Sequence, residues 1–236
     1  MSATENNKIN LNGKSEKYSD LLNMLVDNVS LTGKGLLVNK ESEINHSDDQ
    51  EKINRIAWHF SEIMETLGLD LRDDSLKGTP RRVAKMYVKE IFSGLDPKNK
   101  PAPTLFENKY NYNQMLVEKN IKVQSSCEHH FVPIIGKAHV GYISNGNIIG
   151  LSKINRIVEY YSKRPQLQER LTEQIAAELK EVLQTEDVAV IITAQHMCVT
   201  MRGVEHDDSL TSTSSFNGRF REQTYRNEFM NFINML

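Results

Sequence analysis

The chain has 236 residues, a formal net charge of −2, 39% hydrophobic residues and 25% charged residues. This balance is typical of a soluble globular protein with one domain plus an appendage, or with two small domains. The weak net charge excludes a global basic field for nucleic acid, and no stretch approaches the roughly 20 apolar residues that span a bilayer. We therefore expect neither a nucleic-acid partner nor a membrane partner.

The expected compartment is the cytoplasm, because the N-terminal segment lacks the apolar run of a secretory signal. Only two cysteines are present, Cys127 and Cys198. A reducing cytosol disfavours a structural disulfide between them. A metal site or a reactive thiol is therefore the better interpretation of cysteines that cluster with histidines.

The first predicted unit in chain order is a flexible N-terminal extension over residues 1–48, which is polar and has no sustained apolar period. A helical part follows over residues 49–100, and residues 101–236 form the predicted core of the protein. Within this arrangement, residues 95–118 hold three of the six prolines and are predicted to be an irregular connection.

Two helices are predicted in the helical part. The first carries apolar residues at spacings of three and four over Ile53–Leu67, and Gly68 is its expected stop. The second begins at Thr79 and Pro80, with Thr79 as N-cap and Pro80 at the first helical position, and ends near Gly94.

From Ile121 onward the pattern favours strands that alternate with helices. Strands are predicted over residues 121–125, 137–143, 187–199 and 210–216, and helices over 152–162, 165–183 and from about residue 222. The tripeptide Asn145-Gly146-Asn147 is typical of a hairpin turn. We assign the chain to the α+β class, with an antiparallel sheet packed by helices and preceded by an N-terminal helical segment.

Both cysteines lie beside histidines in two short segments, Cys127-Glu128-His129-His130 and His196-Met197-Cys198. Cys127 and His130 are three residues apart, a spacing that lets both side chains face one point from a tight turn. His196 and Cys198 are two apart in a strand-like run, so we expect both on the same face of the sheet. Thiolate and imidazole donors suit zinc better than magnesium or calcium.

Three interpretations of this cluster are open. The residues could be two buried cysteines with some surface histidines, or a closed structural zinc site with four protein ligands. The third interpretation is a catalytic zinc site, which needs three protein ligands plus water. The surplus of candidate groups favours catalysis, because extra histidines beside an activated water are natural proton carriers.

Two predicted helices begin with basic residues, although the N–H groups at a helix start carry partial positive charge. These residues are Arg81 and Arg82 after Pro80, and Lys153 and Arg156 after Ser152. Either set could be a solvated charged face, but both sets together, with Arg202 after Cys198, favour a bound polyphosphate. Glu169, in the first turn after Pro165, either complements the helix dipole or accepts hydrogen bonds from a base edge.

The motifs together resemble the GTP cyclohydrolase I family of zinc enzymes. The matching segments are residues 74–76, Thr79–Tyr87, Glu90–Leu95, Cys127–Phe131, Ile149–Val158, Arg164–Thr172, His196–Cys198 and Met201–Val204. The resemblance covers the chain from about Ile53 to its C-terminus. It implies the tunnelling fold (T-fold) for the core, GTP as substrate, formate and dihydroneopterin triphosphate as products, and Zn²⁺ as cofactor.

The resemblance also implies a role for each matching site residue. Cys127, His130 and Cys198 would be the zinc ligands, His196 the acid–base residue, and His129 and Ser152 further catalytic residues near the ribose and phosphates. Arg82, Lys85, Lys153, Arg156 and Arg202 would bind the triphosphate, and Glu169 and Gln168 the guanine edge. The expected assembly is a homo-oligomer, a toroidal decamer with active sites at subunit interfaces. The competing classes are a structural-zinc interaction module and a related tunnelling-fold pterin or deazapurine enzyme.

Overall fold

The computed structural model describes residues 48–235. The extension predicted for residues 1–48 therefore lies outside the described residues except for Asp48, and the boundary at residue 100 stays a prediction. None of the described helices combines the length and the apolar character that a bilayer crossing demands.

The first predicted helix is present and ends where the sequence indicates. α2 (Asp49–Thr66) buries Ile53 and Met64, which belong to the apolar stripe seen in the sequence. Gly68 follows with φ +82°, a left-handed conformation that glycine adopts at no steric cost. The predicted stop at this glycine is confirmed.

The second helix, α3 (Thr79–Met86), also begins where predicted, but its cap is different. Pro80 lies in its first turn, whereas the side chain of Thr79 makes no cap to a backbone N–H group. The Thr79 hydroxyl instead accepts a 2.7 Å hydrogen bond from the Arg82 guanidinium. The prediction of Thr79 as N-cap is therefore wrong, because Thr79 is already the first helical residue and Gly78 occupies the cap position. Shorter turns follow as η2 (Tyr87–Ile91), η3 (Ser93–Leu95) and η4 (Pro97–Asn99).

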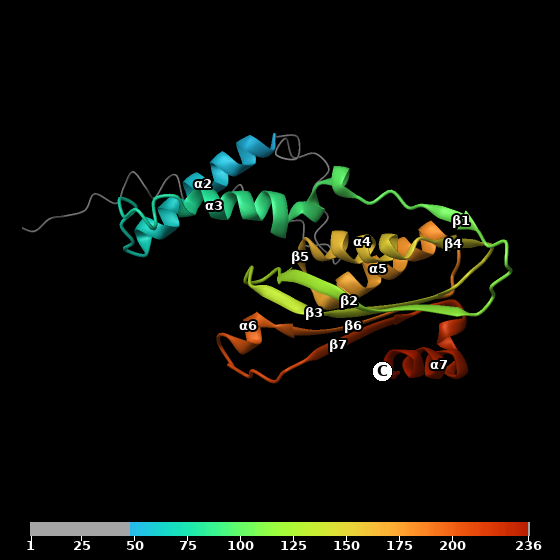
Figure 1. Ribbon diagram of the computed structural model, residues 1–236. Helices are drawn as coiled ribbons and strands as arrows, with labels where there is room; N and C mark the ends of the chain where they lie inside the picture. Colours follow the sequence, from blue (N-terminus) through green and yellow to red (C-terminus); the bar gives the residue numbers. More distant parts are fainter. Residues whose placement is uncertain (1–47, 236) are drawn as a thin grey trace, which may run out of the picture. The chain divides into compact units, whose positions relative to one another are not determined.

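The main sheet has five strands, shown together in Figure 1. In spatial order they are β5 (Pro165–Gln166), β2 (Met115–Cys127), β3 (Pro133–Ile143), β6 (Val188–His196) and β7 (Thr211–Phe216). The long neighbours all pair antiparallel, which confirms the predicted class. β5 alone is parallel to its neighbour, with Gln166 opposite Cys127. The helix predicted from Pro165 therefore begins later, because this short strand takes the first residues.

A second, two-stranded sheet corrects the predicted hairpin. The turn is present, with Gly146 at φ +94°, but β4 (Asn147–Ile149) pairs with β1 (Leu105–Glu107) and not with β3. β3 is an interior strand whose two edges already pair with β2 and β6, so it has no free edge for β4. The connection over residues 95–118 is thus only partly irregular, since it contains β1 and the beginning of β2.

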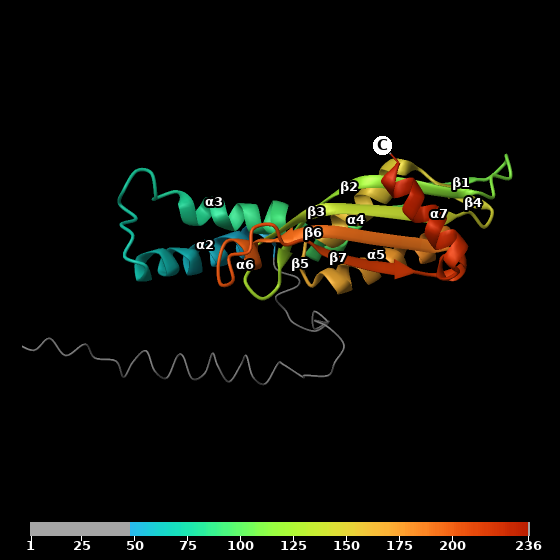
Figure 2. The same ribbon diagram turned by 90° about the horizontal axis from the view of Figure 1, so that it is seen from below.

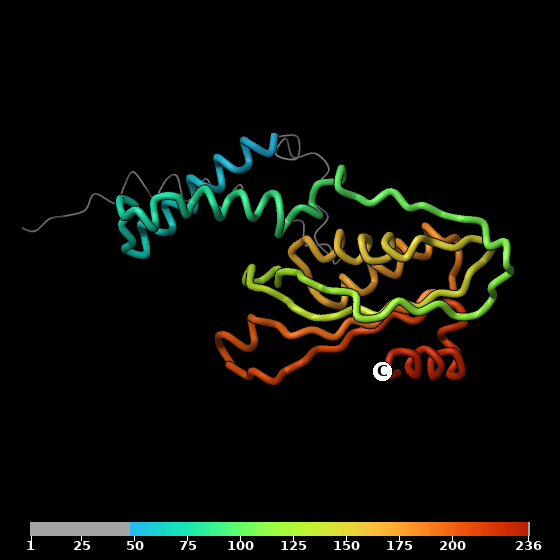
Figure 3. Tube along the Cα trace, viewed as in Figure 1, coloured from blue at the N-terminus to red at the C-terminus, as the bar shows by residue number. Residues whose placement is uncertain are grey.

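Two helices, α4 (Leu151–Ser162) and α5 (Gln168–Leu183), cover one face of the main sheet, and the tube in Figure 3 traces the same layers. Their apolar stripes meet the inward side chains of the strands. This main core includes Val123, Val140, Ile154, Leu171, Ile175, Leu179, Val190 and Ile192. The alternation along β2 and the three-to-four spacing along α5 both place apolar residues toward this layer.

The opposite face of the sheet is covered at one end by η5 (Gly218–Arg221) and α7 (Gln223–Asn234), as the view from below shows (Figure 2). Phe220 and Phe229 are fully buried there, and their rings meet edge to face at 5.6 Å between centroids. Gly141 of β3 lies directly under them, so the absence of a side chain at this position lets α7 approach the sheet.

We predict that Gly141→Ala destabilises the fold, because the new Cβ would lie 2.8 Å from the Phe229 ring. Overpacking of this kind costs about 1–3 kcal/mol of unfolding free energy, measurable by urea denaturation. Gly150→Ala is the matched control, since its Cβ would meet nothing closer than 3.9 Å, and it should cost less, at most about 1 kcal/mol, for the loss of glycine at the N-cap of α4. Equal effects of the two changes would contradict this packing.

Candidate metal centre

The antiparallel order of the sheet brings the two cysteine segments to the same end. β2 and β6 both run toward this end, with β3 between them, as the pairs Ser126–Pro133 and Ile134–His196 show. Two strand spacings separate β2 from β6, which is about 10 Å. The segments that follow each strand must therefore bend over the beginning of β3 for their side chains to meet.

On the β2 side, a tight turn performs this bend. The Cys127 amide donates to the Val132 carbonyl at 2.8 Å, and the Phe131 amide donates to the Cys127 carbonyl at 2.8 Å. Phe131 has φ +56°, so the chain reverses within four residues. His130 lies inside this turn, and its ring is thereby directed to the same side as the Cys127 thiol.

On the β6 side, the structure corrects the expectation of a common strand face. β6 ends at His196, and Cys198 lies in the helical turn α6 (Met197–Thr200). The prediction that His196 and Cys198 project from the same sheet face is therefore wrong. The strand pattern fails because the chain turns helical immediately after His196, which directs the Cys198 thiol toward the Cys127 turn.

The three predicted ligands do form one group, with their donor atoms all within 4.8 Å of one another. The Cys127 Sγ lies 3.8 Å from the His130 Nδ1. Two donors on one tetrahedral zinc, with bonds of about 2.3 Å and 2.0 Å, would be about 3.5 Å apart. Burial, followed by the neighbouring Cys127 thiol, raises the pKa of the Cys198 thiol. A cation among these donors would reverse that effect by favouring the thiolate.

The neighbouring His196 is held by Gln168, the first residue of α5. The Gln168 amide nitrogen donates to the carbonyls of Ile192 and Thr211 at 3.0 and 2.9 Å. Carbonyls only accept, so the Gln168 Oε1 must be the atom that faces the His196 Nε2, 2.7 Å away. The His196 Nε2 therefore carries the hydrogen and Nδ1 keeps a free lone pair. Burial lowers the pKa of His196, and the charge of Glu169 opposes that shift.

Two further predicted residues contact the donor group. The His129 Nδ1 lies 4.0 Å from the Cys127 Sγ, and the His129 side chain is largely exposed. His129 is not a member of the donor group of three. The Arg202 guanidinium donates to the His130 Nε2 at 2.9 Å. Glu169 follows Gln168 and is exposed to solvent.

The remaining predicted substrate residues make no described contact with the donor group. Arg82 donates to the Ser75 carbonyl at 3.1 Å and to the Thr79 hydroxyl, and Lys85 is exposed. Ser152 and Lys153 lie in the first turn of α4 and Arg156 lies near its middle, and the helix runs from the β4 side toward β5 (Figure 1). The end of α4 lies near β5, which pairs beside Cys127. The beginning of the helix is therefore about 15 Å farther from the donor group than its end is.

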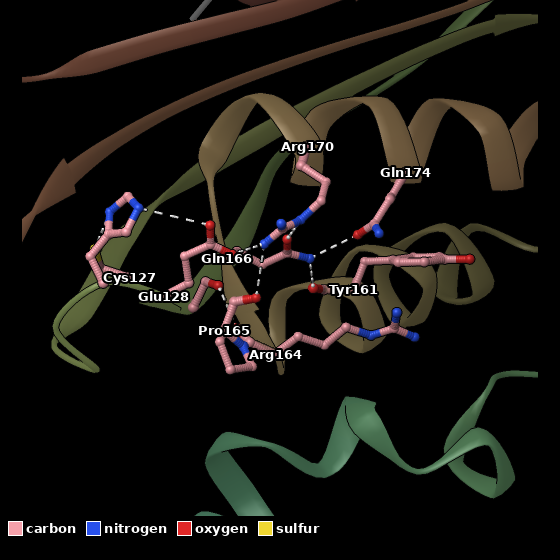
Figure 4. Close-up of polar contacts among 10 residues, drawn as sticks. Cys127, Glu128, Tyr161, Arg164, Pro165, Gln166, Arg170 and Gln174 are labelled. Atoms are coloured by element: carbon pink, nitrogen blue, oxygen red, sulfur yellow. Dashed lines mark hydrogen bonds and ion pairs between the residues drawn. The ribbon is translucent and has the colours of Figure 1, made fainter. Parts of the chain in front are cut away.

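Sequence reasoning missed a network behind the donor turn, shown in Figure 4. The Arg170 guanidinium forms an ion pair with the Glu128 carboxylate, and its Nε donates to the Gln166 side chain at 3.0 Å. A signal was available, because Arg170 is another cation in the first turn of a helix, where the helix dipole disfavours it. The same argument selected the basic residues of the two other helices.

The sheet and the covering helices define an α+β protein of the tunnelling-fold class, with a Cys–His–Cys group that could hold a metal ion. Residues 56–234 match the family model described as GTP cyclohydrolase I. A curated GTP cyclohydrolase 1 of Flavobacterium johnsoniae is 58% identical over 187 residues, covering 79% of this chain and 84% of the relative. The chain belongs to the GTP cyclohydrolase I family.

Other relatives with the same name support this assignment. The Aeromonas hydrophila protein is 54% identical over 179 residues, which are 76% of this chain and 82% of that protein. The Escherichia coli O1:K1 protein is 48% identical over 205 residues, which are 86% of this chain and 92% of that protein. The family membership and the fold class expected from the motifs are thus confirmed.

We predict that the neutral His196 ring carries its hydrogen on Nε2, because the Gln168 amide cannot flip. Nitrogen NMR of histidine-labelled protein at mildly alkaline pH distinguishes the two tautomers. Gln168→Met removes the acceptor and should raise the share of the Nδ1–H form. Gln174→Met is the control, since the recorded partner of the Gln174 side chain is Gln166. A dominant Nδ1–H form in the unmodified protein would contradict the assignment.

Proposed function

We propose that this protein is a zinc-dependent GTP cyclohydrolase I. It opens the imidazole ring of GTP by hydrolysis, releases formate, and forms 7,8-dihydroneopterin triphosphate after rearrangement of the ribose. The observation that carries the proposal is the donor group of Cys127, His130 and Cys198 at the strand end that also holds His196. The family match over residues 56–234 supports GTP as the substrate.

Zinc is the metal that this donor set suits best. Two thiolates and one imidazole are soft or borderline ligands, which magnesium and calcium bind poorly. Three protein donors leave a fourth position open, as in catalytic zinc sites. His129 lies outside the donor group and His196 is hydrogen-bonded to Gln168, so neither completes a closed structural site. When bound, zinc supplies the Lewis acidity that activates water near neutral pH.

His196 is the proposed acid–base residue. Its Nε2 is committed to the Gln168 amide oxygen, so Nδ1 is the nitrogen that exchanges protons with the substrate. We assign to its protonated form, in which Nδ1 also carries a hydrogen, the transfer of that proton to the purine imidazole nitrogen while water attacks C8, which returns His196 to the neutral Nε2–H form. His129 and Ser152 are the proposed catalytic residues near the ribose and phosphates.

Glu169 is the proposed reader of the guanine edge. Its carboxylate is exposed at the beginning of α5, and its charge acts on the pKa of His196. A carboxylate accepts hydrogen bonds from the guanine N1–H and the exocyclic amine, whereas adenine would leave the charge unpaired. The Gln168 side chain is fully engaged with the protein, so its contribution to the base comes from the backbone.

Five basic residues are proposed to bind the triphosphate: Arg82, Lys85, Lys153, Arg156 and Arg202. Arg202 is the one among them that contacts the donor group, through the His130 Nε2. With a metal on Nδ1, the neutral His130 ring carries its hydrogen on Nε2 and cannot accept from a guanidinium. Metal binding would therefore release Arg202, which then becomes available to an anionic ligand.

We propose further that the protein works in the cytoplasm as a homo-oligomer, a toroidal decamer with active sites at subunit interfaces. Two observations support the interface. Lys153 and Arg156 lie in the half of α4 that is farther from the donor group, and a second subunit would supply such residues from a shorter distance. Among the described residues, most of the β2 edge that faces away from β3 and the whole β7 edge that faces away from β6 have no strand partner, and free strand edges readily pair with another chain.

The direct test is turnover of GTP by the zinc-loaded protein, measured as formate release and as fluorescent neopterin after oxidation. Cys198→Ser should lose zinc and activity together. His196→Ala should keep zinc and lower kcat about 10²- to 10⁴-fold. His59→Ala, on α2, is the control and should be unaffected.

Zinc binding without turnover in the unmodified protein would favour an interaction module, and turnover of a different purine or pterin would favour a related enzyme.

The interface is tested by complementation between two inactive variants. Cys198→Ser removes a metal ligand, and Arg156→Ala removes a phosphate ligand of the proposed site. If each site combines residues of two chains, co-expression of both variants should restore about a quarter of the sites. If all residues come from one chain, the hybrid stays inactive. Isolation through two different affinity tags ensures that only mixed oligomers are assayed.

A further inference from the structure

Arg170 of α5 is tied to the turn that carries two metal donors. Its guanidinium forms an ion pair with Glu128, which follows Cys127 directly in the chain. The two side chains are only 23% and 18% exposed, respectively. The pair is therefore better shielded than a surface ion pair, and the loss of one member leaves the other charge poorly compensated.

The protein holds the guanidinium of Arg170 in place from several sides, as Figure 4 shows. Its Nε donates to the Gln166 Oε1 at 3.0 Å, and Nη2 donates to the Pro165 carbonyl at 3.3 Å. The buried Gln166 amide donates in turn to the Tyr161 carbonyl and to Gln174, at 2.8 and 2.9 Å. The orientation of Gln166 is therefore fixed, and with it the direction of the guanidinium.

Helix stability alone does not explain a cation at this position. Arg170 lies in the first turn of α5, where the helix dipole opposes a positive charge. The opposing carboxylate of Glu128 offsets this cost, but Glu128 belongs to the donor turn and not to the helix. The favourable contact of Arg170 is thus made with the metal-binding segment.

The backbone of β5, which lies just before α5, also holds the donor turn. The Glu128 amide donates to the Gln166 carbonyl at 3.1 Å, and Cys127 lies opposite Gln166 in the β2–β5 pair. Arg170 uses the Glu128 Oε2, so Oε1 remains directed at the His129 Nε2, 3.9 Å away. A shift of Glu128 would move both flanking residues, one a donor and the other a proposed catalytic group.

We propose that Arg170 is a positioning residue, which through Glu128 holds the turn of Cys127–Phe131 in the geometry that binds the metal and places His129. The inference rests on the proposed metal centre. Arg170 itself contacts neither the donor atoms nor, in this assignment, the substrate. Residues that orient metal ligands from behind typically contribute 10- to 100-fold to metal affinity or activity.

The first test measures metal affinity without GTP, by chelator competition with Co²⁺ as the spectroscopic probe of thiolate ligation. Arg170→Gln and Glu128→Gln should each weaken binding 10- to 100-fold, and Arg170→Lys should weaken it less. The double variant should bind the metal no more weakly than the single variant with the lower metal affinity, because the two residues act as one pair. Unchanged affinity in the single variants, or additive losses in the double variant, would overturn the proposal.

The matched control is Arg219→Gln, which breaks a comparable partly buried pair with Asp187, 2.7 Å long, on the α7 side of the protein. It should lower the thermal midpoint without changing metal affinity. If Arg170→Gln does not fold, the metal affinities of Arg170→Lys and Glu128→Gln are compared with that of Arg219→Gln instead. A loss of metal affinity in Arg219→Gln as large as in Glu128→Gln would reduce the role of Arg170 to general stability and reject the proposal.

Kinetics separate this proposal from the proposed function. At saturating metal, Glu128→Gln should lower kcat at least about tenfold with KM for GTP changed little, since substrate contacts remain. Normal turnover by all Arg170 and Glu128 variants, with normal metal affinity, would reject the positioning role alone. No turnover by the unmodified protein, with metal affinity still dependent on Arg170, would reject the proposed function alone.

Discussion

The site depends on one constraint of the main sheet, the antiparallel register that carries the ends of β2 and β6 to the same edge with β3 between them. The two donor segments are about 70 residues apart in the chain, yet only two strand spacings apart in space. Each then turns sharply, through the Cys127–Phe131 turn and through α6. A shift of one residue in the register would exchange the two faces of a strand and separate the donors.

The segment from β5 to the beginning of α5 is the second element that both halves of the site share. Gln166 pairs with the β2 end, Gln168 orients His196 on the β6 end, and Arg170 reaches Glu128 in the donor turn. Glu169 lies between these inward residues and is exposed. One short segment thus sets the distance between the metal donors and the acid–base residue, and offers the residue proposed to recognise the base. The side chains of Gln166 and Gln168 are accordingly buried and engaged in several hydrogen bonds each.

The sequence was sufficient wherever the determinants are local. The stripe of α2, the glycine at Gly68 and the alternation in the long strands follow from neighbouring residues, and the Cys–His spacing indicated the donor group. The predictions that failed depend on contacts between residues that are distant in the chain. Pro165 enters a strand because the β2 end offers a partner, and β4 pairs with β1 because β3 has no free edge. Cys198 was misplaced because a strand-like pattern does not show where a strand bends. The charge of Arg170 at a helix start was visible in the sequence, but its partner Glu128, like the partner His196 of Gln168, is distant in the chain.

The second core, on the α7 side of the sheet, has a consequence for synthesis of the chain. Ala189 and Ile191 of β6 and Phe216 at the end of β7 belong to a cluster that Phe229 completes, and α7 is the last described element in chain order. While the chain emerges from the ribosome, the sheet can form with α4 and α5 in place, but this apolar patch stays open to water until α7 follows. The nascent protein therefore passes through a stage in which one exposed apolar sheet face can associate with other chains. Rapid docking of α7 shortens that stage.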